Sequence, residues 1–407
     1  MGWRFNGNEM KYIKEVLDSD FKSSAAGSML GRFEKAFAQK LGVRYAVGIN
    51  SGTSALHAAL AACDVGPSDE VIMPSMTVVM CAYAILASGA RPIFADVDRN
   101  TLLIDPRDIA RKISSKTKAI MPVHMYGQIC DMSSIASIAQ RHGIKIVEDS
   151  AQCHLGRVNG KAGGTIGNIG CFSLGDTKMI STNEGGVVTT NDENLATRVR
   201  KFAYLGFKNL NADNVSMRVD PMIFQNPAYL RHDSFAYSYF MSEVDAAIGL
   251  AQVERIEWFL EKRVKMGRMY LEAVDGCHWF TPQYTPAGHE HAHWTFVACL
   301  QTEKKPNLTW HDFRNKFVEL GGDKIRASYA LVYNEPSVKN ILENGRYFTD
   351  SRRVQSCSPI GEIKPRCPNA EYLQPRLMFF TTNQNTEQEM QKQAEALNKT
   401  IDFFGRK

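Results

Sequence analysis

Short, fully apolar segments alternate with helical patterns between residues 45 and 190, and this alternation constrains the fold more than any other feature of the chain. Buried strands separated by helices are typical of a mostly parallel sheet covered by helices on both faces. The sequence therefore predicts an α/β fold. Strands are expected at 47–50, 70–74, 92–97, 119–123, 144–147, 170–174 and 186–190, and helices at 53–63, 78–88 and 132–142.

The pattern changes after residue 190. Residues 207–234 are rich in Asn, Asp, Pro and Arg, which predicts a long surface loop. A helix is expected over 242–271, because its apolar positions keep to one helical face. We place a boundary in this helix, between a large domain at 1–260 with an N-terminal helical segment and a smaller α+β domain at 261–407. The smaller domain is expected to hold a strand at 293–300 and helices at 310–320 and 387–404.

Charge and cysteine content narrow the function. The net charge of +5 is small for 407 residues, so nucleic acid is not an expected partner, although a mildly basic surface suits anionic substrates such as nucleotide sugars. The nine cysteines show no CxxC pair and no metal-type spacing, which predicts free thiols, no metal site and a cytoplasmic location. The longest weakly polar stretch, 76–90, is too short to span a bilayer, so no membrane partner is expected.

Polar residues follow several of the predicted strands, where ligands bind in open α/β sheets. Lys178 lies between the strands expected at 170–174 and 186–190. Desolvation there would lower the pKa of this lysine and make its amine a better nucleophile toward an aldehyde. An exposed loop lysine is the simpler alternative when this residue is taken alone.

A second polar group follows the strand expected at 144–147. Asp149 could hold the nitrogen of a bound pyridine ring protonated, although helix capping explains it too. Gln152 could form a hydrogen bond with a phenolic oxygen nearby. Glu148 is expected to face solvent or to support the site from behind.

A third group lies where the first strand turns into the first helix of the sheet. Gly52 and Thr53 stand at a helix N-terminus rich in hydroxyl groups, which could bind phosphate, but N-capping explains the pattern equally well. His57 is expected to be a packed core residue. The glycine-rich run at 163–170 precedes a strand and not a helix, so a dinucleotide loop is rejected.

The order and spacing of these segments resemble the sugar aminotransferases of the DegT/DnrJ/EryC1/StrS family, a branch of the fold type I enzymes that use pyridoxal 5′-phosphate (PLP). The resemblance runs from about residue 33 to 192 and resumes at 241–249. It implies a homodimer with shared active sites. The matching segments are FEKAFAQKLGVRYAVGINSGTSALHAAL, DEVIMPSMT, GARPIFADVD, TKAIMPVHMYGQICDM, VEDSAQCHLG and CFSLGDTKMISTNEGGVVTTND.

The resemblance also implies roles for individual residues. Lys178 would form the Schiff base with PLP, and Asp149 would pair with the pyridine nitrogen. Gln152 would lie near the phenolic oxygen. The phosphate would be held by Gly52, Thr53 and Ser173.

The implied reaction moves an amino group from an amino acid, such as L-glutamate, to a keto- or aldehydo-sugar, with a nucleotide-linked sugar as the leading acceptor. Arg326 matches roughly the place of a basic residue that the family puts near the acceptor. A surface salt bridge is the alternative for this arginine.

Three features depart from the family pattern. Val78 stands where the family usually has an aromatic residue that stacks on the cofactor. The family's Asn-Tyr-Arg-Met segment, whose Asn reaches the phosphate of the neighbouring subunit, is Ser-Tyr-Phe-Met here. Ser238 can still donate a hydrogen bond, whereas Phe240 cannot replace a guanidinium group. The loop at 207–234 also looks longer than usual.

Two other hypotheses remain at this stage. One is a PLP-dependent sugar dehydratase or elimination enzyme, but relatives of that kind carry histidine in place of Lys178. The other is a non-catalytic regulatory or scaffolding relative, against which the joint presence of Lys178, Asp149, Gln152 and Ser173 argues.

Overall fold

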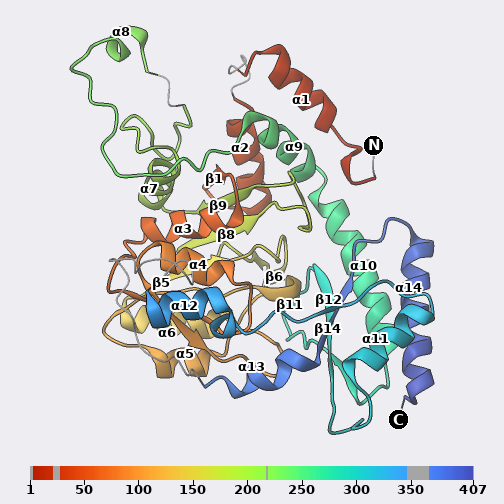
Figure 1. The fold of residues 1–407 in the computed structure, drawn as a ribbon. Helices are drawn as coiled ribbons and strands as arrows, with labels where there is room; N and C mark the ends of the chain where they lie inside the picture. The colour runs from red at the N-terminus through yellow and green to blue at the C-terminus, as the bar shows by residue number, and fades with distance from the viewer. Residues whose placement is uncertain (1–2, 22–27, 217–218, 346–365, 407) are drawn as a thin grey trace.

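A computed structural model describes residues 3–21, 28–216, 219–345 and 366–406 of the chain. The centre of the molecule is a seven-stranded sheet in the order β1-β9-β8-β5-β4-β2-β3 (Figure 1). The five strands from β8 to β3 are parallel, whereas β9 is antiparallel to both of its neighbours. The strands are β1 (Tyr45–Ile49), β2 (Glu70–Pro74), β3 (Arg91–Ala95), β4 (Thr117–Ile120), β5 (Lys145–Asp149), β8 (Ile169–Ser173) and β9 (Gly186–Thr190).

Helices cover this sheet and begin at residues that suit helix starts. Ser51, Asp131 and Asp192 each accept a backbone N–H from the first turn of the helix that follows, as N-cap residues do. The strands can be apolar on both faces because helices lie over both. The helices before residue 204 are α1 (Glu9–Asp18), α2 (Met29–Leu41), α3 (Gly52–Ala62), α4 (Met80–Ala87), α5 (Pro106–Lys112), α6 (Met132–His142) and α7 (Glu193–Ala203).

The C-terminal part is a four-stranded antiparallel sheet in the order β10-β12-β14-β13, with helices packed against it. It has its own apolar core, to which Trp279, Phe313 and Phe380 contribute. The α/β prediction with a smaller α+β part is thereby confirmed. The elements are α10 (Ile256–Val274), β10 (Phe280–Pro282), β12 (Thr295–Leu300), α11 (Trp310–Glu319), β13 (Arg326–Ala327), β14 (Leu377–Thr381) and α14 (Glu387–Phe404).

The single helix expected over 242–271 is wrong in its middle. The structure has α9 (Glu243–Val253) and α10, separated at Glu254 and Arg255, where the Arg255 backbone leaves helical geometry with φ −117° and ψ 11°. Helix α10 contributes Ile256 and Phe259 to the core of the large sheet and Met266 to the second core. The boundary at residues 260 and 261 stays a prediction.

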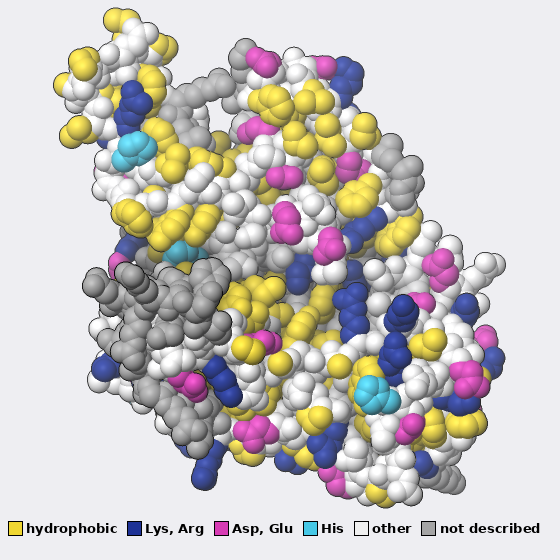
Figure 2. Space-filling model, in the orientation of Figure 1, with side chains coloured by type: hydrophobic (Ala, Val, Ile, Leu, Met, Phe, Trp, Pro, Cys, Tyr) yellow, Lys and Arg dark blue, Asp and Glu magenta, His cyan; other side chains and the backbone are white. Residues whose placement is uncertain are grey.

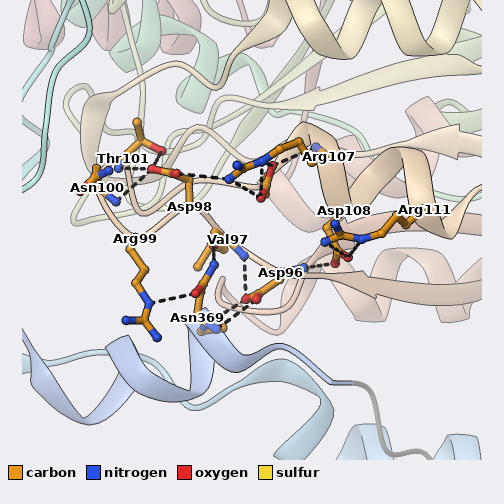
Figure 3. A network of polar contacts seen from close by, with 12 residues as sticks. Asp96, Val97, Asp98, Arg99, Asn100, Thr101, Arg107, Asp108, Arg111 and Asn369 are labelled. Carbon is orange, nitrogen blue, oxygen red and sulfur yellow. Dashed lines mark hydrogen bonds and ion pairs between the residues drawn. The ribbon is translucent and has the colours of Figure 1, made fainter.

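Polar contacts fix part of the C-terminal chain on the large sheet (Figure 3). The carboxylate of Asp96, after β3, accepts the backbone N–H groups of Asn369 and Ala370 at 3.0 and 2.9 Å, at the start of α13 (Pro368–Leu373). The Asn369 side chain donates to the carbonyl of Val97 at 2.9 Å. Helix α12 (Pro336–Asn344) also returns to the core of the large sheet, through Val338.

Two smaller features complete the fold. A three-stranded sheet combines β11 (His289–Glu290) with β6 (Arg157–Val158) and β7 (Lys161–Ala162). The described residues of the segment 207–234 form a loop as predicted, except for the short helix α8 (Pro221–Phe224). Among the described residues, none of the helices is both long enough and apolar enough to cross a bilayer.

Candidate active site

The carboxyl ends of β5 and β8 bring two candidate residues together. Asp149 ends β5 and is only 2% exposed, and Ser173 ends β8 and is half-buried. The two strands are parallel neighbours, with Asp149 paired to Cys171 in the register. A buried carboxylate and a hydroxyl group therefore face the same edge of the sheet.

Lys178 lies in the loop that joins β8 to β9. Its Nζ atom lies 4.9 Å from the ring centroid of Trp294, whose indole Nε1 donates to the carbonyl of Thr177 at 2.9 Å. Burial lowers the pKa of Lys178 from its usual value, while Asp149 and Asp176 partly oppose this shift. The neutral amine is therefore available at lower pH than in an exposed lysine.

The start of α3 faces Ser173 closely. A Cβ atom on Gly52 would lie 2.8 Å from Cβ of Ser173, so only glycine allows this approach. Ser51 Oγ accepts the N–H of Ser54 at 3.1 Å, and the N–H groups of Gly52 and Thr53 have no intrahelical partner. Backbone donors at a helix N-terminus beside a serine hydroxyl form a suitable seat for a phosphate group.

Gln152 is buried, and its hydrogen bonding fixes its orientation. Its Oε1 atom accepts the backbone N–H of Tyr126 at 3.0 Å. Tyr126 holds this N–H in place from a left-handed conformation, with φ 68°. The amide nitrogen of Gln152 consequently remains as a donor, which suits a phenolic oxygen as its acceptor.

Glu148 differs from its neighbour Asp149. It is fully buried, so the expectation that it faces solvent is wrong and the alternative of a supporting role holds. Its carboxylate pairs with His124 at 2.8 Å and accepts three backbone N–H groups from the glycine-rich turn before β8, at 2.5 to 2.9 Å. Those donors are Gly164, Ile166 and Gly167.

Asp149 has fewer partners than Glu148. Its Oδ1 accepts the N–H of Ala151 at 2.9 Å, and among the described residues its Oδ2 accepts only the thiol of Cys81, at 3.1 Å. A thiol is a weak donor. The carboxylate can therefore exchange this contact for a stronger one with a bound ligand.

The remaining sequence-predicted residues lie farther out. Ser238 is exposed, and its backbone bridges to Tyr204. Phe240 packs edge-on against Tyr204, with ring centroids 5.0 Å apart, and Val78 is half-buried against the large core. The described contacts do not join Ser238 to the group formed by Asp149, Ser173 and Lys178.

Arg326 is exposed on β13. Burial raises the pKa of Tyr329, and the charge of Arg326 and a side-chain hydrogen bond with Gln152 both oppose that shift. No ion pair of Arg326 occurs in the described part of the chain, which leaves the salt-bridge alternative without support.

Sequence reasoning missed three residues near the site: Cys81, Trp294 and Tyr329. Each lies far along the chain from its partner, and no local pattern marks it. The positions of Trp294 and Tyr329 depend on how the C-terminal part packs against the Lys178 loop, which periodicity does not report.

His57 and the glycine run behave as predicted. His57 is buried, with Nδ1 3.0 Å from the hydroxyl of Tyr239 and Phe202 edge-on to its ring. The run at 163–170 leads into β8 and not into a helix. The eight described cysteines are all free, as predicted, and buried.

These residues fit PLP: an amine after β8, an under-satisfied carboxylate after β5, an amide donor and a helix N-terminus that glycine keeps open. A mostly parallel sheet that carries this set defines a fold type I PLP-dependent enzyme. The chain belongs to the DegT/DnrJ/EryC1/StrS aminotransferase family, whose model matches residues 4–340. The predicted family and PLP-dependent aminotransferase activity are thereby confirmed.

Individual relatives agree with this assignment. The chain is 38% identical over 291 residues to a GDP-perosamine synthase of Caulobacter vibrioides, covering 68% of this chain and 74% of that protein. It is 38% identical over 269 residues to a GDP-perosamine synthase of Escherichia coli O157:H7, covering 66% and 69%. An aminotransferase structure from Psychrobacter cryohalolentis superposes with a TM-score of 0.82 at 28% identity, over 97% of both chains. The elimination and non-catalytic hypotheses are not favoured by these likenesses.

Proposed function

We propose that this enzyme transfers an amino group from an amino acid, such as L-glutamate, to a nucleotide-linked keto-sugar. The observation that carries the proposal is the desolvated Lys178 in the loop after β8, whose charge is influenced by Asp149 at the end of β5. The names of relatives, GDP-perosamine synthases among them, support a nucleotide-linked acceptor. The mildly basic chain is compatible with such an anionic substrate.

PLP supplies an aldehyde for the amine and a ring that withdraws electrons from the reacting carbon. Lys178 would hold PLP through its Nζ atom. When its amine is free, Lys178 would act as the base that accepts the proton of the donor Cα and, as the conjugate acid, would return that proton to the reacting group. Asp149 would keep the ring nitrogen protonated, and Gln152 would donate to the phenolic oxygen.

The phosphate seat is assigned to Gly52, Thr53 and Ser173. Ser238 is proposed to act at the phosphate of a second subunit, because its exposed position lies apart from the other candidates. On the acceptor side, Arg326 is proposed to bind an anionic group of the sugar nucleotide, and its charge acts on Tyr329, which forms a side-chain hydrogen bond with Gln152.

A homodimer with shared sites is also proposed, and exposed apolar side chains around α8 support it. Several large apolar side chains are exposed in and beside α8, where Figure 2 shows apolar side chains at the upper left of the molecule. Exposed apolar surface of this kind marks an interaction site. The residues are Met222, Ile223, Phe224, Leu230 and Phe235, of which Phe235 is 83% exposed.

The mass in solution tests the dimer. Wild-type protein is expected at twice the 45.5 kDa chain mass in light scattering. Phe235→Asp should shift the population toward the monomer, whereas Phe403→Asp, at an exposed position on α14, should not. A monomeric wild-type protein would contradict the proposal.

The buried free thiols support a cytoplasmic location. The expectation that neither nucleic acid nor membrane is a partner stays a prediction.

Nitrogen transfer tests the reaction. The PLP-loaded enzyme is incubated with 15N-labelled L-glutamate and GDP-linked or dTDP-linked 4-keto-6-deoxy sugars, and the sugar product is analysed by mass spectrometry. The label should appear in the sugar with the wild type and with Lys161→Ala, an exposed lysine on β7, but not with Lys178→Ala. A product that loses a hydroxyl group without gaining nitrogen would favour the elimination enzyme.

A further inference from the structure

Three cationic side chains meet beside the loop that carries Lys178. Arg4 comes from the short N-terminal 3-10 helix, and Lys262 and Arg263 come from α10. They line a small cavity with a volume of about 20 Å³. The other lining residues are Trp3, Met179, Phe259, Thr382 and Asn383.

The polar partners of these cations are neutral. Arg263 is 6% exposed and donates through one terminal nitrogen to the carbonyl of Trp294 at 2.7 Å and to the hydroxyl of Thr382 at 3.1 Å. Arg4 donates to the backbone carbonyls of Asp176, at 2.5 Å, and of Lys178. Each group is therefore solvated by dipoles rather than by a counter-charge.

Lys262 has the same kind of surroundings. Its ammonium group donates to the carbonyl of Asn385 and lies 4.9 Å from the ring centroid of Trp3. Asp176 acts on Arg4 and Glu389 acts on Lys262 at longer range. Within the described ranges, none of the three cations forms an ion pair with a carboxylate.

Burying a charge without a partner is costly, and two guanidinium groups in one apolar region also repel each other. Burial and, to a lesser extent, the charge of Arg4 together lower the pKa of Arg263 to about 9. Lys178 feels the same cluster, because Arg263 is among the groups that lower its pKa. A negative charge in the cavity would offset the cost of burying the cations, the repulsion between the two guanidinium groups and the lowering of the Lys178 pKa.

The size of the cavity limits what can supply this charge. A volume of about 20 Å³ is enough for one water-sized particle. A halide ion has that size, whereas the carboxylate of an amino acid brings its Cα atom with it. Figure 2 shows Lys and Arg side chains gathered over α10, on the face where the large sheet meets the C-terminal part.

We propose that this cavity binds a single small monovalent anion of the chloride type. The anion joins the N-terminal segment, α10 and the end of β14 to the loop that carries Lys178. Trp294 transmits its effect, because its carbonyl accepts from Arg263 while its ring lies against the Lys178 ammonium group. The proposal does not depend on which sugar the enzyme accepts.

Thermal unfolding of the PLP-loaded full chain tests the site. At constant ionic strength, replacing sodium gluconate by sodium chloride should raise the melting temperature by roughly 1–3 °C, with saturation at a defined concentration. The increment should disappear in Arg263→Met and in Arg4→Met. It should persist in Arg268→Met, which removes an exposed guanidinium group from the same helix.

A crystallographic experiment on the wild-type enzyme tests the site even if the variants fail to fold. Crystals of the wild-type enzyme soaked in sodium bromide should show an anomalous peak in the cavity between Arg4 and Arg263. An empty cavity together with equal melting temperatures in chloride and gluconate would overturn the proposal. Stabilisation by acetate but not by chloride would also overturn it, in favour of a carboxylate from the donor.

Discussion

Asp149 and Gln152 lie almost fully buried at the end of β5, whereas Arg326 and Ser238 lie exposed on two separate segments of the chain. We call the first group, with Gly52, Thr53, Ser173 and Lys178, the cofactor side. Arg326, with Tyr329, is the proposed acceptor side, whereas Ser238 is proposed to reach the cofactor phosphate of a second subunit. On the cofactor side, backbone donors fix Asp149 and Gln152 before any ligand binds. On the proposed acceptor side, Arg326 is exposed, and its position depends on how the C-terminal part packs.

This difference in burial between the two sides predicts where substitutions are tolerated. Substitution of a pre-oriented, desolvated group should cause a large loss of catalytic activity, because no water molecule or neighbouring side chain can take its place. An exposed arginine contributes less, because solvent screens its charge. Substitutions on the cofactor side should therefore act on turnover, and those on the acceptor side on the Michaelis constant.

The largest effect is expected for Asp149→Asn. The amide keeps the size of the side chain but removes the negative charge that holds the ring proton, so kcat should fall by about 10²–10⁴-fold. Unfolding temperatures should stay close to those of the wild type, because the amide oxygen can still accept the N–H of Ala151. Retention of more than a tenth of wild-type turnover would remove Asp149 from the mechanism.

Substitution of the adjacent carboxylate, Glu148, should lower stability more than turnover. Glu148→Gln leaves buried donors on His124 and the turn at 164–167 with weaker acceptors, which should cost about 2–3 kcal/mol of unfolding free energy. Denaturant titration measures this loss. The folded variant should keep more of its turnover than Asp149→Asn, and the reverse order of the two activities would contradict the assignment of roles.

The pH dependence of cofactor capture sharpens the account of Lys178. Only the neutral amine attacks the aldehyde, so below the pKa the rate of PLP capture by the apoenzyme should rise about tenfold per pH unit. Because burial lowers the pKa of Lys178, the rate should level off below the usual 10.5. Stopped-flow absorbance checks this, and a rate still rising at pH 10.5 would mean that Lys178 is not desolvated.

A smaller effect is expected on the acceptor side. Arg326→Met should raise the Michaelis constant for the sugar nucleotide by about 5–10-fold and leave kcat within about twofold, as expected for a partly screened ion pair. The control is Arg376→Met, which removes an arginine that contacts Thr302 and Tyr372 and has no place in the site. An unchanged Michaelis constant for Arg326→Met would reject its role.

Sequence reasoning works best where buried strands carry their own signal. The strands β1 to β9 of the large sheet lie within a few residues of the predicted positions, and Asp149 ends β5 directly after the apolar run at 144–147. Ser173 ends β8, but its role is implied by the family resemblance and not by the strand pattern. Parallel strands bring their carboxyl ends to one edge. Local sequence patterns are therefore enough to predict where this part of the site lies.

The missed features depend on contacts between distant segments. The break between α9 and α10 coincides with Glu254, whose carboxylate accepts from Asn8 at 2.7 Å and from Tyr12 at 2.5 Å, both in the N-terminal region. Helical periodicity continues through that point and gives no sign of it. The position of Trp294 beside Lys178 also depends on contacts between distant segments, because it is set by the packing of β12 and not by the neighbours of Trp294 in the chain.

The central claim is that Lys178 carries the cofactor, and chemical trapping tests it most directly. The enzyme is loaded with PLP, reduced with sodium borohydride, digested and mapped by mass spectrometry. The account predicts a single modified lysine at Lys178, with no label when L-glutamate is added before reduction. Label on another lysine, or none without glutamate, would contradict the assignment of the site.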